Sequence, residues 1–123
     1  MKYAVFITIF LLSANIHVQA QSIRKLDDRT AFETAVKSNE NVVIIFAAEW
    51  CDYCKAFLPK VGSIVEDYEG VKFFRINYDE NIALFQAEGI EATPTVKLYK
   101  NGTKMDEIVT IEVEPLQEKL RGF

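Results

Sequence analysis

The chain has 123 residues, of which 50% are hydrophobic and 26% are charged. This composition is typical of a folded globular protein, and the length allows one domain. The formal charge of −4 argues against nucleic acid or an anionic membrane as the main partner, because the basic residues are scattered along the chain and form no phosphate-binding cluster.

The first twenty residues have the composition of a secretory signal peptide. Lys2 provides a positive start, Tyr3–Leu12 is an almost unbroken apolar run, and Val18 and Ala20 place small side chains at a cleavage site. The run is too short to span a bilayer comfortably, so we expect residues 1–20 to be removed and no stable membrane anchor to remain. An uncleaved N-terminal anchor is the alternative.

Cleavage near Ala20 leaves residues 21–123 as one domain, which is expected to be secreted or periplasmic. His17 is the only histidine of the chain, so this domain has none. A Ser–His–Asp triad, a Cys–His pair or a histidine-based metal site cannot be built from it. We therefore expect chemistry that uses no metal and no other cofactor.

The first half of the domain predicts two strands and a helix. Residues 22–26 form a short mixed run that suits an edge strand. Thr30 and Glu33 have the spacing of a capping box, and the apolar positions around them predict a helix over residues 30–38. The run Val42–Ala47 is apolar on both alternating faces, so it predicts a central strand with helices on both sides of its sheet.

The pattern then changes to a helical stripe that extends from Cys54 to Tyr68. Pro59 lies inside this predicted helix and should kink it, because proline removes a hydrogen bond and crowds the preceding turn. Residues 71–77 predict another strand. Residues 81–88 predict a short helix, with Gly89 as its C-terminal cap.

The last part of the chain predicts a hairpin and a helix. Residues 95–99 and 107–111 are strands joined through Asn101-Gly102, two residues that tolerate positive φ. Glu114-Pro115 starts a helix that runs towards Leu120, with proline at the favoured first position. The order β-α-β-α-β-α-β-β-α predicts an α/β fold in which helices flank a central mixed sheet.

Two cysteines, Cys51 and Cys54, lie between the central strand and the kinked helix. Cysteines three residues apart at a helix start can close a small disulfide, and the free N–H groups there stabilise a thiolate. We expect Cys51, the more exposed, to be the attacking nucleophile and Cys54 to resolve the mixed disulfide. Half a zinc site is the first alternative, but the domain lacks further ligands. A structural disulfide is the second, although such bonds usually join distant segments.

The segment Phe46–Lys55 resembles the active-site segment of thioredoxins, whose usual core is Trp-Cys-Gly-Pro-Cys-Lys. Pro59 stands where thioredoxins carry their helix-kinking proline. Ala92–Thr95 resembles the loop whose cis-proline packs beside the disulfide in that family, and Tyr99–Gly102 matches its hairpin. The resemblance covers about Ile23–Leu120 and implies a thioredoxin-like fold.

This resemblance also implies roles for individual residues. The Thr93–Pro94 bond would be cis and form one wall of a substrate groove, where the backbone of Thr93 pairs with an extended segment of the bound protein. A plain proline at the start of a strand is the alternative for Pro94. Trp50 would shield the disulfide and belong to the docking surface, together with Asp52 and Tyr53 between the cysteines.

Two departures from the thioredoxin pattern concern proton transfer at the inner cysteine and charge beside the outer one. Ile45 stands where thioredoxins have a buried aspartate that moves a proton to or from the inner cysteine. Glu49 or Lys55 could substitute, although we favour solvated surface charges for both. A carboxylate at Asp52 disfavours a thiolate on Cys51 and thereby stabilises the disulfide, which predicts a more reducing protein; the effect is small if Asp52 points into water.

A third departure concerns the groove wall, where thioredoxins have a glycine and this chain has Val109-Thr110-Ile111. A side chain there narrows the groove or adds an apolar contact, so we expect a different choice of partner from that of cytosolic thioredoxins. Asn101 also begins an N-glycosylation sequon, which matters only in a eukaryotic secretory pathway.

Together these features predict an exported thiol–disulfide oxidoreductase that acts on protein disulfides or dithiols through Cys51 and Cys54, with reduction favoured over oxidation. Its electron donor or acceptor is not named by the sequence, and a monomer is expected because both cysteines are committed. The main alternative is a thioredoxin-like binding module whose disulfide is idle. A thiol peroxidase is a weaker alternative, since the extra loop and the arginine arrangement it requires are not visible.

Overall fold

The centre of the protein is a five-stranded mixed sheet with the strand order β1-β3-β2-β4-β5. This computed structural model describes residues 22–123, so the predicted signal peptide at 1–20 lies outside the described residues. No helix within residues 22–123 is long and apolar enough to cross a membrane.

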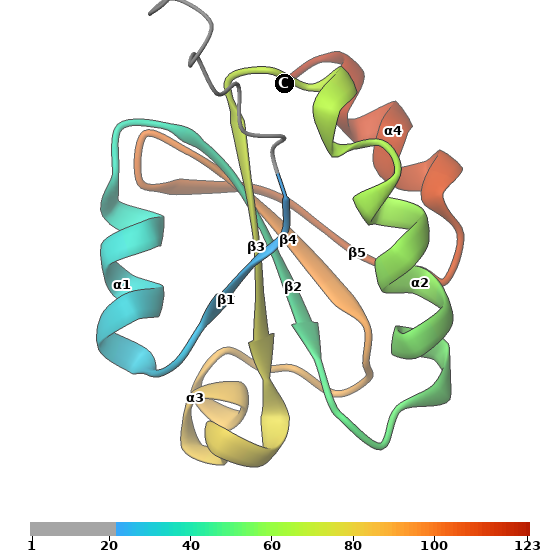
Figure 1. Ribbon diagram of the computed structural model, residues 1–123. Helices are drawn as coiled ribbons and strands as arrows, with labels where there is room; N and C mark the ends of the chain where they lie inside the picture. Colours follow the sequence, from blue (N-terminus) through green and yellow to red (C-terminus); the bar gives the residue numbers. More distant parts are fainter. Residues whose placement is uncertain (1–21) are drawn as a thin grey trace, which may run out of the picture.

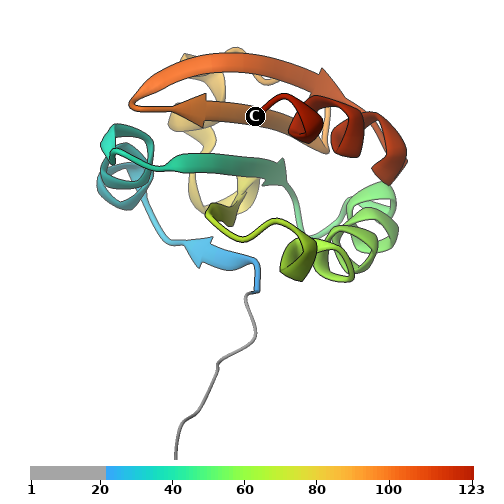
Figure 2. The ribbon, with the colours of Figure 1, turned by 90° about the horizontal axis from the view of Figure 1, so that it is seen from above.

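The elements follow one another in the predicted order, with two additional 3-10 turns, η2 and η3. Their bounds are β1 (Arg24–Leu26), α1 (Arg29–Lys37), β2 (Asn41–Ala47), α2 (Asp52–Gly62), η2 (Val65–Asp67), β3 (Val71–Asn77), η3 (Tyr78–Glu80), α3 (Ile82–Ala87), β4 (Thr95–Lys100), β5 (Thr103–Val109) and α4 (Val113–Arg121). Helices α1 and α3 cover one face of the sheet, and α2 and α4 cover the other (Figures 1 and 2).

Strand β2 is the central strand, as its apolar run predicts. It pairs in parallel with β3 and antiparallel with β4, and every residue from Val42 to Ala47 is buried. Its side chains alternate between two cores. Val43 and Ile45 pack with residues of α2 and α4, whereas Ile44 and Phe46 pack with residues of α1 and α3. The sheet is therefore fixed between two apolar layers.

The start of α1 differs from the prediction. Helix α1 begins at Arg29, and its N-cap is Asp28, whose carboxylate accepts a hydrogen bond of 2.9 Å from the N–H of Ala31. Thr30 lies inside the helix, so the predicted capping box with Glu33 is wrong. Aspartate is as strong an N-cap as serine or threonine, and Asp28 takes the role first because it lies upstream.

The helix that carries Cys54 is shorter than predicted. Helix α2 contains Pro59 and ends at Gly62, and the 3-10 turn η2 follows after a break. Glycine is a poor helix former. The hydroxyl of Ser63 donates a hydrogen bond of 2.7 Å to the carbonyl of Lys60, which competes with continued helical bonding. The apolar stripe towards Tyr68 is thus shared by two elements.

The C-terminal hairpin and helix are also shifted. Asn101 and Gly102 have φ values of 53° and 83°, as the predicted turn requires. Strand β5 begins and ends earlier than the predicted residues 107–111. Helix α4 starts at Val113, which makes Pro115 its third residue rather than its first. Proline fits there as well, because the first N–H groups of a helix have no intrahelical partner.

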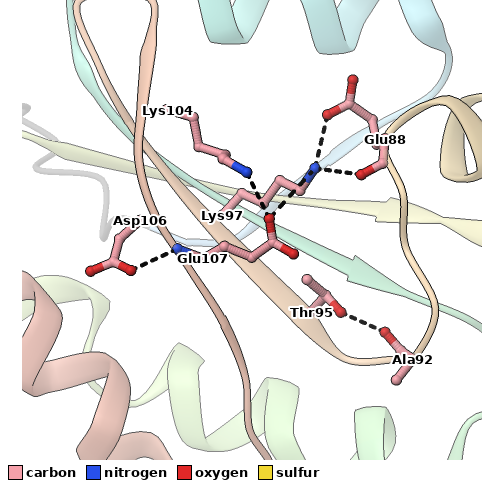
Figure 3. A network of polar contacts seen from close by, with 7 residues as sticks. All are labelled: Glu88, Ala92, Thr95, Lys97, Lys104, Asp106 and Glu107. Carbon is pink, nitrogen blue, oxygen red and sulfur yellow. Dashed lines mark hydrogen bonds and ion pairs between the residues drawn. The ribbon is translucent and has the colours of Figure 1, made fainter.

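A buried lysine lies on β4 among apolar neighbours. Lys97 is 3% exposed, and its ammonium donates hydrogen bonds of 2.8 Å to the carbonyl oxygen and 3.0 Å to the carboxylate of Glu88 (Figure 3). The same ammonium lies 3.9 Å from the carboxylate of Glu107 on β5 and 5.3 Å from the ring centroid of Phe46. These contacts compensate the buried charge and tie the end of α3 to the hairpin.

A second polar contact fixes the other end of the segment between α3 and β4. The hydroxyl of Thr95 donates a hydrogen bond of 2.6 Å to the carbonyl of Ala92 (Figure 3). With Lys97 holding Glu88, both ends of this segment are attached to β4. Thr93 and Pro94 lie between Ala92 and Thr95, the two residues joined by this second contact, so their position relative to the sheet is well defined.

Candidate active site

The two cysteines lie where β2 leads into α2. Cys51 is the N-cap of α2, and Cys54 lies in its first turn; the two sulfurs form a disulfide. Cys51 is 5% exposed and Cys54 is 1% exposed. The order of exposure agrees with the prediction, but both sulfurs are buried. They share a small apolar cluster with Ala47 and Ala48.

Two contacts define the surroundings of the Cys51 sulfur. The N–H of Cys54 donates a hydrogen bond of 3.1 Å to it, and the carbonyl oxygen of Thr93 lies 3.5 Å away. In the disulfide, sulfur carries no hydrogen, so the contact with Thr93 becomes a hydrogen bond only when Cys51 is reduced to a thiol. The N–H at the helix start favours a thiolate on Cys51, whereas the apolar cluster disfavours one.

A cavity of about 580 Å³ opens beside the outer cysteine, lined by Trp50, Cys51, Asp52, Tyr53, Ala92 and Thr93. The structure thus brings together most of the residues singled out from the sequence, from segments that are far apart in the chain. The Thr93–Pro94 peptide bond is cis, and Pro94, the residue after the lining residue Thr93, is buried. Trp50 and Tyr53, which both line this cavity, are 62% and 63% exposed and give it an apolar surface.

Trp50 is held by residues that sequence analysis missed. Its indole N–H donates a hydrogen bond of 3.1 Å to the carboxylate of Asp79, and its ring meets that of Tyr78 edge to face. Tyr78 in turn meets Phe85 of α3 in the same way. Asp79 and Tyr78 follow β3 directly, and nothing in their local sequence pairs them with a tryptophan 29 residues upstream.

Comparisons with known proteins agree with this geometry. The thioredoxin family model matches residues 23–121. The chain is 34% identical to thioredoxin Asp f 28 of Aspergillus fumigatus, covering 78% of this chain and 90% of that protein. It is 30% identical to thioredoxin-1 of Schizosaccharomyces pombe, covering 81% and 97%. The chain belongs to the thioredoxin family.

Solved thioredoxins share the fold. The Malassezia sympodialis thioredoxin superposes with a TM-score of 0.76 at 28% identity, covering 88% of this chain and 96% of that one. Mitochondrial thioredoxin 3 from Saccharomyces cerevisiae, in its oxidised form, gives 0.76 at 29% identity, covering 82% and 95%. Like its relatives, this protein is a thiol–disulfide oxidoreductase, with Cys51 and Cys54 as its redox-active pair. Thioredoxins act on the disulfides of other proteins.

The structure shows how this chain departs from the rest of the family around its cysteines. Ile45 is fully buried in the core between β2 and α2, so an apolar side chain fills the place of the family's buried aspartate. Asp52 points into water, with Lys55 its nearest cation at 3.9 Å. Solvent screens the charge of Asp52, so its effect on Cys51 is the smaller of the two outcomes expected from the sequence.

The segment that replaces the family's groove glycine lies beside the cavity but not in its lining. Val109 is the last residue of β5 and pairs with Thr95, the residue after Pro94. Val109 and Ile111 both expose their side chains. The cavity lining contains neither of them. Val109 therefore adds an exposed apolar side chain on the strand next to Thr95.

No group of three or more potential metal ligands occurs within residues 22–123. The cysteine pair itself is closed as a disulfide. Closed at the start of α2, this pair can carry out redox chemistry with its own side chains.

Proposed function

We propose that this protein is an exported thioredoxin that reduces disulfides in other proteins. The Cys51 thiolate attacks a substrate disulfide, forms a mixed disulfide and releases one substrate sulfur as a thiolate. Cys54 then attacks Cys51, which closes the Cys51–Cys54 disulfide and releases the second substrate sulfur. Two electrons pass from the cysteine pair to the substrate, and solvent protonates both of its thiolates.

The observation that carries this proposal is the position of the cysteine pair, at the start of α2 and beside an open cavity. The cavity has room for a short peptide segment, and the exposed rings of Trp50 and Tyr53 supply apolar contacts for it. On the opposite side, Thr93 offers backbone groups to an extended segment. A substrate lying across the cavity would present its sulfur to Cys51, as family resemblance implies.

The surroundings of the sulfurs support reduction as the proposed direction of the reaction. Burial of Cys51 and Cys54 beside Ala47 and Ala48 disfavours a charged thiolate, and a disfavoured thiolate stabilises the disulfide. The N–H of Cys54 at the helix start and the cations Lys55 and Arg75 act in the opposite sense, but Asp52 and Tyr53 between the cysteines add no further positive charge. A stable disulfide makes the reduced pair a donor of electrons, which supports reduction over oxidation.

Export rests on the composition of residues 1–20. Expression of the full chain in a cell with an export pathway, followed by mass measurement, tests it. A secreted or periplasmic product that begins near Gln21 is expected, whereas a full-length product retained in the cytosol would contradict export. The same mass measurement detects glycosylation of Asn101 in a eukaryotic host. Size-exclusion chromatography tests the expected monomeric state.

A trapping experiment tests the roles of the two cysteines. With Cys54→Ser, attack by Cys51 should stop at the mixed disulfide, which accumulates with a protein substrate and is detected by mass spectrometry. With Cys51→Ser, the buried Cys54 should form almost no mixed disulfide. Equal trapping by both variants would contradict the assigned roles, and trapping by neither would favour the binding module.

A further inference from the structure

The resolving step poses a chemical requirement at Cys54. The attacking species is the thiolate, so the Cys54 thiol must lose a proton before or during its attack on Cys51. Cys54 is 1% exposed, and the side chains packed with it include Ala47, Ala48 and the partly buried Leu58. None of these can accept a proton, so the acceptor must be reached by another route.

A second cavity supplies such a route. It has a volume of about 150 Å³ and is lined by Ala47, Ala48, Glu49, Cys54, Lys55, Leu58, Arg75 and Asn77. None of these residues lines the larger cavity beside Cys51, so each cysteine faces a cavity of its own. A space of this size holds several water molecules. Glu49 is the one carboxylate among its lining residues.

Glu49 is held in a defined orientation at this cavity. The side-chain amide of Asn77 donates a hydrogen bond of 2.8 Å to one carboxylate oxygen of Glu49. Asn77 is 4% exposed and is the last residue of β3, so its amide is fixed by the sheet. The backbone N–H of Glu49 also approaches the carboxylate of Asp79 at 3.4 Å. Glu49 itself is exposed, so its carboxylate can exchange a proton with solvent, while the bond from Asn77 keeps one of its oxygens at the sheet.

We propose that Glu49, positioned by Asn77, accepts the proton of the Cys54 thiol through water in this second cavity. The proton passes from Cys54 to water and from water to the Glu49 carboxylate, while the Cys54 sulfur bonds to the Cys51 sulfur. The bond between Cys51 and the substrate sulfur breaks, and that sulfur leaves as a thiolate. Glu49 then returns its proton to solvent. This inference rests on the proposed function, since it assigns a proton acceptor to its second step.

The charged groups around the second cavity are compatible with this role. Lys55 of α2 and Arg75 of β3 line it, and their positive charges favour a thiolate on Cys54 over the thiol. Asp79 of η3 approaches the backbone of Glu49 rather than its carboxylate. Tyr78, also of η3, packs against the cysteine cluster. Glu49 is therefore the acidic group that Cys54 can reach through this cavity.

The experiment uses the prereduced full chain and a symmetrical aromatic disulfide that releases one coloured thiolate in each step. The first release follows attack by Cys51 and reports the proposed function. The second follows attack by Cys54 and reports proton removal. With Glu49→Gln, which keeps the shape and the hydrogen bond from Asn77, the first release should be unchanged. The second should slow by on the order of tenfold or more.

Three further readouts separate proton transfer from a structural role. In Glu49→Ala, added formate should restore the second release in proportion to its concentration, whereas chloride at equal ionic strength should not. In the unmodified protein, the rate of the second release should fall as acid protonates the Glu49 carboxylate. In Glu49→Gln, this fall should be absent. Asn77→Ala should slow the second release less than Glu49→Gln does, as expected of a positioning residue.

Glu66→Gln is the matched control, because it removes the same charge from an exposed residue of η2 beyond the far end of α2. It should leave both releases unchanged. A second release in Glu49→Gln as fast as in the unmodified protein, or one that formate does not accelerate in Glu49→Ala, would overturn the role of Glu49. Loss of the first release in the unmodified protein would instead overturn the proposed function.

Discussion

The indole nitrogen of Trp50 donates a hydrogen bond of 3.1 Å to one carboxylate oxygen of Asp79, and the other oxygen of Asp79 lies 3.4 Å from the backbone N–H of Glu49. One side chain in η3, just after β3, therefore contacts both residues that precede Cys51. Trp50 is 62% exposed, and apart from this hydrogen bond its ring is held by its edge-to-face contact with Tyr78. Asp79 thus connects the rigid sheet to the surface on which substrate is expected to dock.

Asp79→Ala should loosen Trp50 and weaken substrate docking. We expect lower fluorescence anisotropy of Trp50, the only tryptophan, and a KM for a protein disulfide that rises several-fold. Loss of a partly exposed hydrogen bond should reduce the free energy of unfolding by about 1 kcal/mol. Asp67→Ala, on the exposed face of η2, is the control. Identical anisotropy in both variants would contradict a holding role for Asp79.

Lys97 should be important for stability because it is buried with its charge paired. Lys97→Ala leaves a gap beside Phe46 and removes the donor from the Glu88 carbonyl, so we expect a loss of about 3 kcal/mol in the free energy of unfolding. Lys97→Met fills the space and should cost about 1 kcal/mol, since water can reach the carboxylates that it frees. Denaturant unfolding measures both.

The exposed Lys72→Ala on β3 is the control for general effects of losing a lysine. If Lys97→Ala unfolds at the same denaturant concentration as Lys72→Ala, the network in Figure 3 contributes nothing to stability.

Asp106 should contribute to the loss of folding stability at acid pH. The hydrogen bond from Lys119 of α4, followed by that from the backbone N–H of Glu107, holds the pKa of Asp106 below its ordinary value of 3.8. A carboxyl whose pKa is lower in the folded than in the unfolded state stabilises the fold above that ordinary value, and this contribution is lost as the pH falls through the folded pKa. Asp106→Asn should therefore show a flatter decline in unfolding free energy below about pH 4.

The expected difference for Asp106→Asn is small, because both partners of this ion pair are substantially exposed to water. Unfolding curves measured at a series of acid pH values check it, and 1 M salt should remove most of the difference. Parallel curves for the two proteins at low salt would contradict the assignment.

Much of the fold is readable from the chain because it depends on local patterns. The continuous apolar run of β2 identifies the central strand, and Asn101-Gly102 identifies the hairpin by the positive φ that both residues adopt. The boundaries are less readable, since they depend on competition between neighbours. Asp28 displaces Thr30 as the cap of α1, and Gly62 with Ser63 stops α2 before its apolar stripe ends.

The candidate site, like the fold, is only partly predictable from the sequence. Cys51 and Cys54 are visible from their spacing at a strand–helix junction, whereas the groups that hold their neighbours are not. Asn77 and Asp79 reach the active site only because β3 lies next to β2 in the sheet, which brings the ends of both strands together. Such partners are set by tertiary structure, and no local pattern marks them.

Lys97 is a further example, because a lysine in an apolar strand reads as a residue facing solvent. Its burial depends on Glu88 and Glu107, which come from two other elements. Neither the charge nor the sequence spacing of these residues predicts that they contact one another.

The measurement that tests the central claim most directly is the redox equilibrium of residues 21–123 in glutathione buffers, followed by the fluorescence of Trp50 next to the disulfide. We expect a midpoint below about −250 mV, close to that of thioredoxins, because the buried apolar surroundings of Cys51 and Cys54 favour the disulfide. A midpoint above about −200 mV, in the range of isomerases and oxidases, would contradict the assignment of this protein as a reductase.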